Sequence, residues 1–113
     1  MEVSYRETGD ITIIALSGSI KTNDDYDVFK RAIDDVVHRG KRNVLLNFKE
    51  VNFINSSGLG RLILAGKHIT DDNGSLKIAE LSDDLRELFT FTRLDTKIPI
   101  FDKEDQAIAS FRN

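Results

Sequence analysis

Short apolar segments of strand character alternate with segments of helical periodicity along this chain. Residues 11–16 and 43–48 have continuous apolar centres, which is typical of strands that are buried on both faces of a sheet. Residues 3–7 alternate side chains in the manner of an edge strand, and Gly9-Asp10 turns them back onto residues 11–16 as a hairpin. Two further short strands are predicted at residues 76–78 and 98–101, and Pro99 suits an edge position in the second.

Four segments carry helix signals. The first is predicted to have Asn23 as its N-cap, followed by aspartates where the helix dipole favours negative charge. The second begins after residues 55–58, and the third and fourth are predicted to be capped by Ser82 and Asp102. The predicted inner face of the second helix consists of Leu59, Leu62, Ile63, Gly66 and Ile69.

The resulting order is ββαβαβαβα, which predicts an α/β fold with a mixed, mostly parallel sheet and about four helices. The chain has 113 residues, one proline and no Pro/Gly/Ser-rich linker, so residues 1–113 are expected to form a single domain.

Composition excludes several classes of function. The net charge is −3 and the basic residues are scattered, which argues against nucleic acid as a partner. No cysteine is present, so disulfides and thiolate metal sites are excluded, and the absence is compatible with a reducing cytosol. The start of the chain is unlike a secretory signal, and no apolar run is long enough for a membrane span. We therefore expect a cytoplasmic protein without membrane insertion.

The segment Asn55-Ser56-Ser57-Gly58-Leu59-Gly60 places three capping residues and two glycines where a strand gives way to a helix. One capping residue is enough for a helix, so two polar side chains should remain near the surface. Free backbone N–H groups and the helix dipole favour an anion at this position. A phosphate on Ser56 would add roughly −1.5 to −2 charges there. The residues alone fit either a binding site or a turn with redundant caps.

This segment resembles the signature of the STAS-domain family, in which apolar residues precede Asp-Ser-Ser-Gly-Leu-Gly and a helix. Leu16-Ser17-Gly18-Ser19-Ile20 is similar to a second stretch of that family. Within the family, the chain is most similar to free-standing anti-sigma factor antagonists. The resemblance implies a protein that sequesters an anti-sigma factor, which is itself a serine kinase. It also implies that phosphorylation of Ser56 ends binding, and that a PP2C-type phosphatase restores it.

Two positions depart from the family pattern. Asn55 stands where the family usually has aspartate, and Lys21 stands where an acidic residue is common. A kinase that recognises those carboxylates would lose two favourable contacts. Lys21 would favour either an acidic partner or a phosphate on Ser56. The substitutions also motivate an alternative function: a STAS adaptor without phosphorylation, in another signalling or transporter-associated complex.

The predicted partner surface contains the signature loop, the start of the helix that follows, and the loop after the second strand. Its residues are Ser19, Lys21, Asn23, Asn55, Ser56, Ser57, Gly58, Leu59 and Arg61.

We predict no enzymatic activity, no metal site and no cofactor. The chain has two histidines, His38 and His68, and no set of ligands surrounds them in sequence. Ser56, His68 and Asp71 form a triad only on paper, because Ser56 is not in a Gly-x-Ser-x-Gly turn. The glycines of the signature do not extend to a dinucleotide-binding motif.

Overall fold

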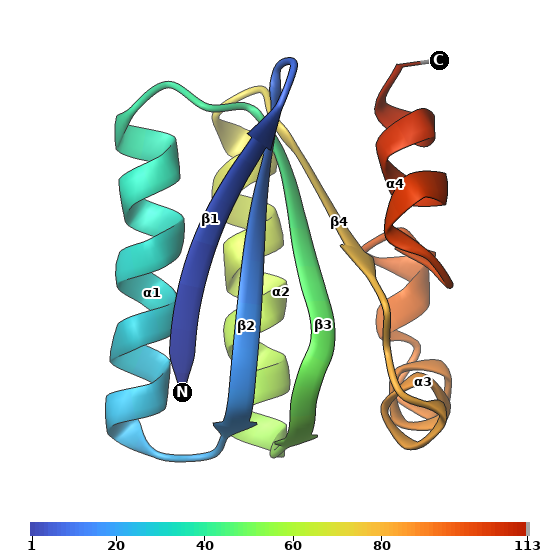
Figure 1. Cartoon of the computed structure of the whole chain (residues 1–113). Helices are drawn as coiled ribbons and strands as arrows, with labels where there is room; N and C mark the ends of the chain where they lie inside the picture. The colour runs from blue at the N-terminus through green and yellow to red at the C-terminus, as the bar shows by residue number, and fades with distance from the viewer. Residues whose placement is uncertain (113) are drawn as a thin grey trace.

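The computed structural model describes residues 1–112 and contains a five-stranded sheet with helices on both faces (Figure 1). The strands are β1 (Glu2–Thr8), β2 (Ile11–Ile20), β3 (Asn43–Ile54), β4 (Ser75–Ala79) and β5 (Ile100–Phe101). The helices are α1 (Asn23–His38), α2 (Ser56–Asp71), α3 (Asp83–Phe91) and α4 (Glu104–Phe111), with a 3₁₀ turn η1 at Leu94–Thr96. The predicted order of strands and helices is confirmed.

The strands lie in the spatial order β1-β2-β3-β4-β5. β1 is antiparallel to β2, and every other pair is parallel, which confirms the mixed, mostly parallel sheet. The carboxyl ends of β2 and β3 therefore meet at one edge of the sheet, the lower edge in Figure 1, where Ile20 is paired with Ile54. The loops that leave these two strands are neighbours for the same reason.

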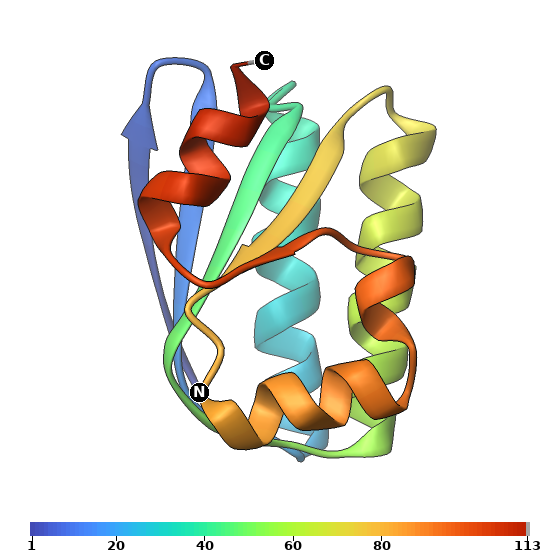
Figure 2. The same ribbon diagram turned by 90° about the vertical axis from the view of Figure 1, so that its right-hand side faces the viewer.

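The main core lies between the sheet and the two long helices. α1 and α2 cover the rear face of the sheet in Figure 1, and α3 crosses its lower part (Figure 2). The ring of Phe89 on α3 meets the ring of Phe48 on β3 edge to face, with centroids 6.0 Å apart. The largest fully buried side chains include Phe29, Phe48, Phe89, Ile14, Leu16, Ile20, Leu46, Leu62 and Ile69.

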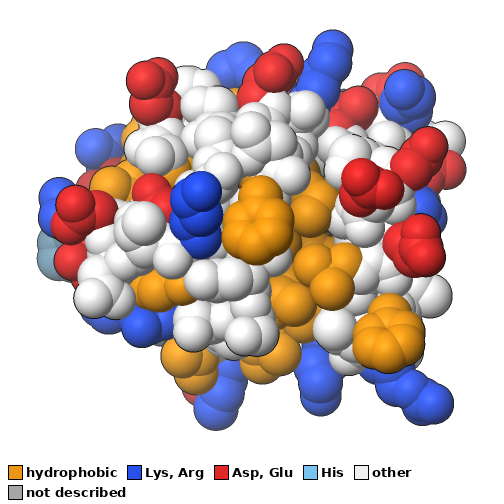
Figure 3. All heavy atoms as spheres, turned by 90° about the horizontal axis from the view of Figure 1, so that it is seen from below, with side chains coloured by type: hydrophobic (Ala, Val, Ile, Leu, Met, Phe, Trp, Pro, Cys, Tyr) orange, Lys and Arg blue, Asp and Glu red, His pale blue; other side chains and the backbone are white. Residues whose placement is uncertain are grey.

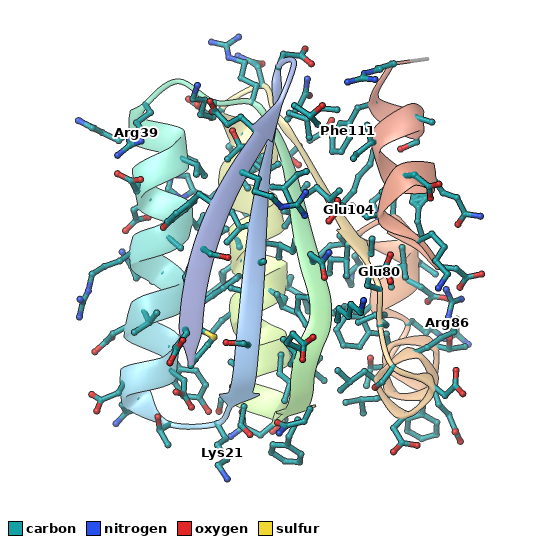
Figure 4. All side chains as sticks on the ribbon, in the orientation of Figure 1. Lys21, Arg39, Glu80, Arg86, Glu104 and Phe111 are labelled. Carbon is teal, nitrogen blue, oxygen red and sulfur yellow. The ribbon has the colours of Figure 1, made fainter. Side chains whose placement is uncertain are left out.

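The opposite face of the sheet carries a smaller core under α4. Ala107 packs there against Ile11, Ile13, Leu45 and Ala79. Polar contacts fix the start of α4: the Glu104 carboxylate accepts hydrogen bonds from Arg6 and Asn47, both at 2.6 Å, and the Glu104 N–H donates to Glu80 Oε2 at 2.7 Å. Figure 4 shows Glu80 and Glu104 between the sheet and α4. Burial raises the pKa of Glu104, but the hydrogen bonds from Arg6 and Asn47, together with the positive charge of Arg6, outweigh it and lower the pKa below its ordinary value.

Predicted details of α4, α2 and the last strand are wrong. Asp102 does not cap α4: the N-cap is Lys103, and the Asp102 carboxylate accepts a hydrogen bond from Arg86 instead. Ile63 is not on the inner face of α2: it is 39% exposed, and the buried face includes Ala65 instead. The last strand is confined to Ile100–Phe101, and Pro99 precedes it.

Candidate functional site

The two loops of the predicted partner surface lie side by side at the lower edge of the sheet. β3 leads into α2 through Asn55, and β2 leads into α1 through residues 21–22. The Asn55 N–H donates to the carbonyl of Ile20 at 3.2 Å, so the backbone of one loop is bonded directly to the end of the other strand. This bond follows from the parallel pairing of β2 and β3.

The side chain of Asn55 connects three segments. As the N-cap of α2, its Oδ1 accepts a hydrogen bond from the Gly58 N–H at 2.8 Å and another from the Tyr26 hydroxyl at 2.7 Å. Its Nδ2 donates to the Lys21 carbonyl at 3.2 Å. An aspartate could accept the first two bonds but could not donate the third. The amide at this position therefore suits the local structure of this chain.

Ser56 and Ser57 occupy the first two positions of α2, and both are exposed. Asn55 provides the cap, so neither serine is needed for it. Within residues 1–112, neither serine hydroxyl makes a hydrogen bond. The prediction that one polar residue caps the helix while the others remain at the surface is confirmed.

Gly58 and Leu59 face inward and support the loop from below. Leu59 is buried, and a Cβ on Gly58 would lie 2.6 Å from Ile54 Cγ1 and 3.1 Å from the Ile20 carbonyl oxygen. Only glycine allows the first turn of α2 to pack this closely on the ends of β2 and β3. The close approach occurs within the molecule and fixes the position of Ser56.

The loop after β2 is fixed by a capping box. Thr22, not Asn23, is the N-cap of α1, so that prediction is wrong: the Asp25 N–H donates to Thr22 Oγ1 at 3.1 Å. The Asp25 carboxylate accepts in return from the N–H groups of Lys21 and Thr22, both at 3.0 Å. Asn23 is the first, exposed residue of the helix.

Hydrogen bonds hold the Asp25 carboxylate in its ionised form. The N–H of Lys21 contributes most to lowering the pKa of Asp25 to about 2, burial opposes the shift, and Thr22 and the amino group of Met1 add to it. Only 9% of Asp25 is exposed. The carboxylate therefore keeps the loop around Lys21 in one conformation.

The remaining predicted residues surround this centre. Arg61 is exposed, and its guanidinium carbon lies 4.9 Å from the centroid of the Tyr26 ring, a cation–π contact that joins α1 to α2. Ser19 is half-buried and donates to Asn52 Oδ1 at 2.8 Å. Lys21 extends below the ends of the strands (Figure 4).

The electrostatics of the loop suit an anion. The first turn of α2 contains no acidic residue, and its free N–H groups lie at the helix start, where Ser56 is. Two exposed basic residues belong to the same site: Lys21 on the neighbouring loop and Arg61 on α2 itself. A negative group on Ser56 would therefore be compatible with the free protein.

Two residues of the site were missed in the sequence. From its helical spacing Tyr26 is expected only to face the sheet. That its hydroxyl donates to Asn55 could not be predicted, because no local pattern indicates a contact between residues 29 positions apart. Asp25 could have been found: Thr22-x-x-Asp25 before an apolar run is a capping-box pattern.

The triad drawn from the sequence is not assembled. His68 lies twelve residues after Ser56 on the same helix, about 18 Å along its axis, and its Nδ1 is 3.6 Å from Asp34 Oδ1.

No three His, Asp or Glu side chains within residues 1–112 gather closely enough to hold a metal ion. In the same residues, no helix combines the length and apolar character needed to cross a bilayer.

Comparison with known proteins gives a family match over nearly the whole chain. The family model described as STAS domain matches residues 2–107. Among curated relatives, the chain is 29% identical over 76 residues to a protein of Bordetella bronchiseptica assigned as an anti-sigma factor antagonist, BtrV. That match covers 67% of this chain and 66% of the relative, just under two thirds of its length. The anti-sigma F factor antagonist of Paenibacillus polymyxa is 23% identical over 96% of this chain and 92% of its own.

Solved structures share the fold. An anti-sigma factor antagonist from Mycobacterium paratuberculosis superposes with a TM-score of 0.88 at 20% identity, over 99% of this chain and 94% of that chain. The Bacillus cell fate determinant SpoIIAA in its phosphorylated form superposes with a TM-score of 0.72 at 20% identity, over 97% of this chain and 99% of that chain.

Proposed function

The chain belongs to the STAS-domain family, and from that premise we propose that it is an anti-sigma factor antagonist switched by phosphorylation of Ser56. In this proposal the unmodified protein sequesters an anti-sigma factor that is a serine kinase. The kinase phosphorylates Ser56, binding ends, and a PP2C-type phosphatase restores the binding form in the cytoplasm. The observation that carries the proposal is the exposed Ser56 hydroxyl at the start of α2, left free because Asn55 caps the helix.

The geometry supports a switch that acts on docking. A phosphate on Ser56 would add roughly −1.5 to −2 charges next to the N–H groups of α2, which favour an anion. The free protein would tolerate that charge, because Ser56 is exposed and the first turn of α2 contains no acidic residue. A partner packed over the same loop would have to bury the charge or pair it, and an unpaired buried charge is costly. Phosphorylation would therefore weaken the complex without unfolding the antagonist.

The test uses the purified anti-sigma factor kinases of the source organism, each measured for binding by calorimetry. We expect Ser56→Ala to bind as the unmodified protein does and Ser56→Asp to bind more than about tenfold more weakly. With ATP, intact mass should show one added phosphate on the unmodified protein and on the matched control Ser57→Ala, and none on Ser56→Ala. Equal binding of Ser56→Ala and Ser56→Asp to the same kinase would refute the switch.

A second candidate is favoured by Asn55 and Lys21, which remove two acidic groups from the proposed kinase contact. The protein would then be a STAS adaptor in another signalling or transporter-associated complex, without phosphorylation. Intact mass of the protein purified from its native cells separates the two: a phosphorylated fraction located at Ser56 excludes the unmodified adaptor.

A further inference from the structure

The face that carries Ser56 also carries two exposed phenylalanines. Phe53, next to last in β3, is 48% exposed, and Phe91, at the end of α3, is 86% exposed. Leu81 and Leu88 are half-buried and pack on the main core from the same region. We call these four residues the phenylalanine patch.

The topology explains why the four residues share one face. Leu81 follows β4, which runs parallel to β3 but ends opposite Asn47, and the chain then continues downward into α3 (Figure 1). Leu88 and Phe91 are three residues apart and lie on neighbouring positions of the α3 surface. Seen from below, hydrophobic side chains form a band across this face (Figure 3). Apolar bands of this kind on a soluble domain mark binding surfaces.

The patch is continuous with residues 55–57, which carry the exposed serines and which we call the serine loop. Phe53 lies two residues before Asn55 in the chain, and it is paired with Ser19 across the sheet. A partner that covered Ser56 would therefore also meet Phe53. Aromatic side chains at the centre of an interface commonly supply a large share of the binding energy.

The charges on the α3 side of the patch are negative. Asp83 and Asp84 are exposed in the first turn of α3, and Glu87 is exposed one turn later. In Figure 3, acidic side chains flank the hydrophobic band on the right, and a basic side chain stands on its other side. The fitting partner surface has an apolar centre and a basic rim toward α3.

Building on the proposed function, we propose that the phenylalanine patch is the second half of the docking surface. Its occupant is an apolar, basic-rimmed surface of the same anti-sigma factor, whose cations pair with Asp83 and Asp84. In this arrangement the carboxylates that the partner's cations recognise lie on α3. They do not lie at positions 21 and 55, where this chain carries a lysine and an amide.

The apolar half is tested with Phe53→Ser and Phe91→Ser against the anti-sigma factor kinase that the unmodified protein binds. Each should weaken binding more than about tenfold. The matched controls are Tyr5→Ser and Leu64→Ser, which remove exposed apolar side chains elsewhere and should bind normally. Phe91 is so exposed that its replacement should leave the thermal unfolding midpoint unchanged, so a loss of binding by that variant is a loss of contact.

The acidic half is tested with Asp83→Asn/Asp84→Asn, with Asp71→Asn/Asp72→Asn at the far end of α2 as the control. The first pair should weaken binding and reduce its dependence on salt, and the second should do neither. If Ser56→Asp abolishes binding while the phenylalanine variants bind normally, the patch is refuted and the switch stands. If the phenylalanine variants lose binding while Ser56→Asp does not, the patch stands and the switch fails. Absence of binding by any kinase overturns both.

Discussion

One amide side chain, Asn55, holds the β3–α2 junction, the start of α1 and the Lys21 backbone together. Asn55→Ala removes the helix cap, which alone lowers the free energy of unfolding by about 1–2 kcal/mol. It also leaves the Tyr26 hydroxyl without its partner. Tyr26→Phe should lower the free energy of unfolding by about 1 kcal/mol. Because the two variants lose the same bond, the double variant should lower the free energy of unfolding by less than the sum of the two single effects. Urea unfolding of the four proteins measures this, and strict additivity would contradict a shared bond.

Asp25 should make stability depend on pH. Its pKa in the folded protein is about 2, below the ordinary 3.8, so the folded state favours the ionised carboxylate. The stability it contributes is fully present above about pH 4 and is lost as the pH falls toward 2. The difference in free energy of unfolding between the unmodified protein and Asp25→Asn should therefore shrink across this range.

Chemical denaturation at a series of pH values measures that difference. The control is Asp24→Asn, since Asp24 is exposed in the same helical turn. A difference for Asp25→Asn that stays constant from neutral pH to pH 2 would show that its charge does not fix the loop.

At the scale of elements, the fit of α2 against the sheet depends on one glycine. Gly58→Ala would place its Cβ 2.6 Å from Ile54 Cγ1, so the helix start must move, at a cost of about 1–3 kcal/mol. Gly60, two residues later, has no atom within 4 Å of the position that a Cβ would take, and Gly60→Ala should stabilise the helix by about 0.5–1 kcal/mol. Opposite shifts of the thermal midpoint are expected, and a midpoint that rises for both variants would contradict the packing argument.

The elements themselves could be predicted because their signals are local. The apolar centre of residues 43–48, the basic end of α1 and the polar run at Asn55 each depend on a few neighbouring residues. Contacts across the fold could not be predicted in this way. Ile63 fits the helical period of α2 but lies on its flank, because the direction in which a helix packs is set by the sheet.

The same limit applied to the site. The exposed serines followed from counting caps, since one helix needs one cap. The bond between Tyr26 and Asn55 depends on α1 and α2 starting at the same edge of the sheet, which is a property of the assembled fold. Thr22 and Asn23 are both good caps, and only the return bonds of Asp25 decide between them.

At the scale of the whole molecule, stability and docking lie in different places. The large core is behind the sheet, the smaller one is under α4, and the serine loop with the phenylalanine patch occupies the lower edge. Glu104 and its partners hold α4 on the face opposite α1 and α2. Ser56 is exposed and belongs to neither core, so a change of charge on its side chain adds no charge to either one.

This separation predicts that a negative charge at Ser56 leaves the fold intact. Aspartate at the first position of α2 interacts favourably with the helix dipole, so Ser56→Asp should raise the free energy of unfolding by about 0.3–1 kcal/mol at low salt. The same variant should bind the anti-sigma factor more than about tenfold more weakly than the unmodified protein. Denaturation and calorimetry on one preparation measure both effects, and Ser56→Asn is the neutral control. Loss of binding together with a lower unfolding midpoint would mean that the charge acts by disrupting the helix, because a docking switch requires a partner-free protein at least as stable as before.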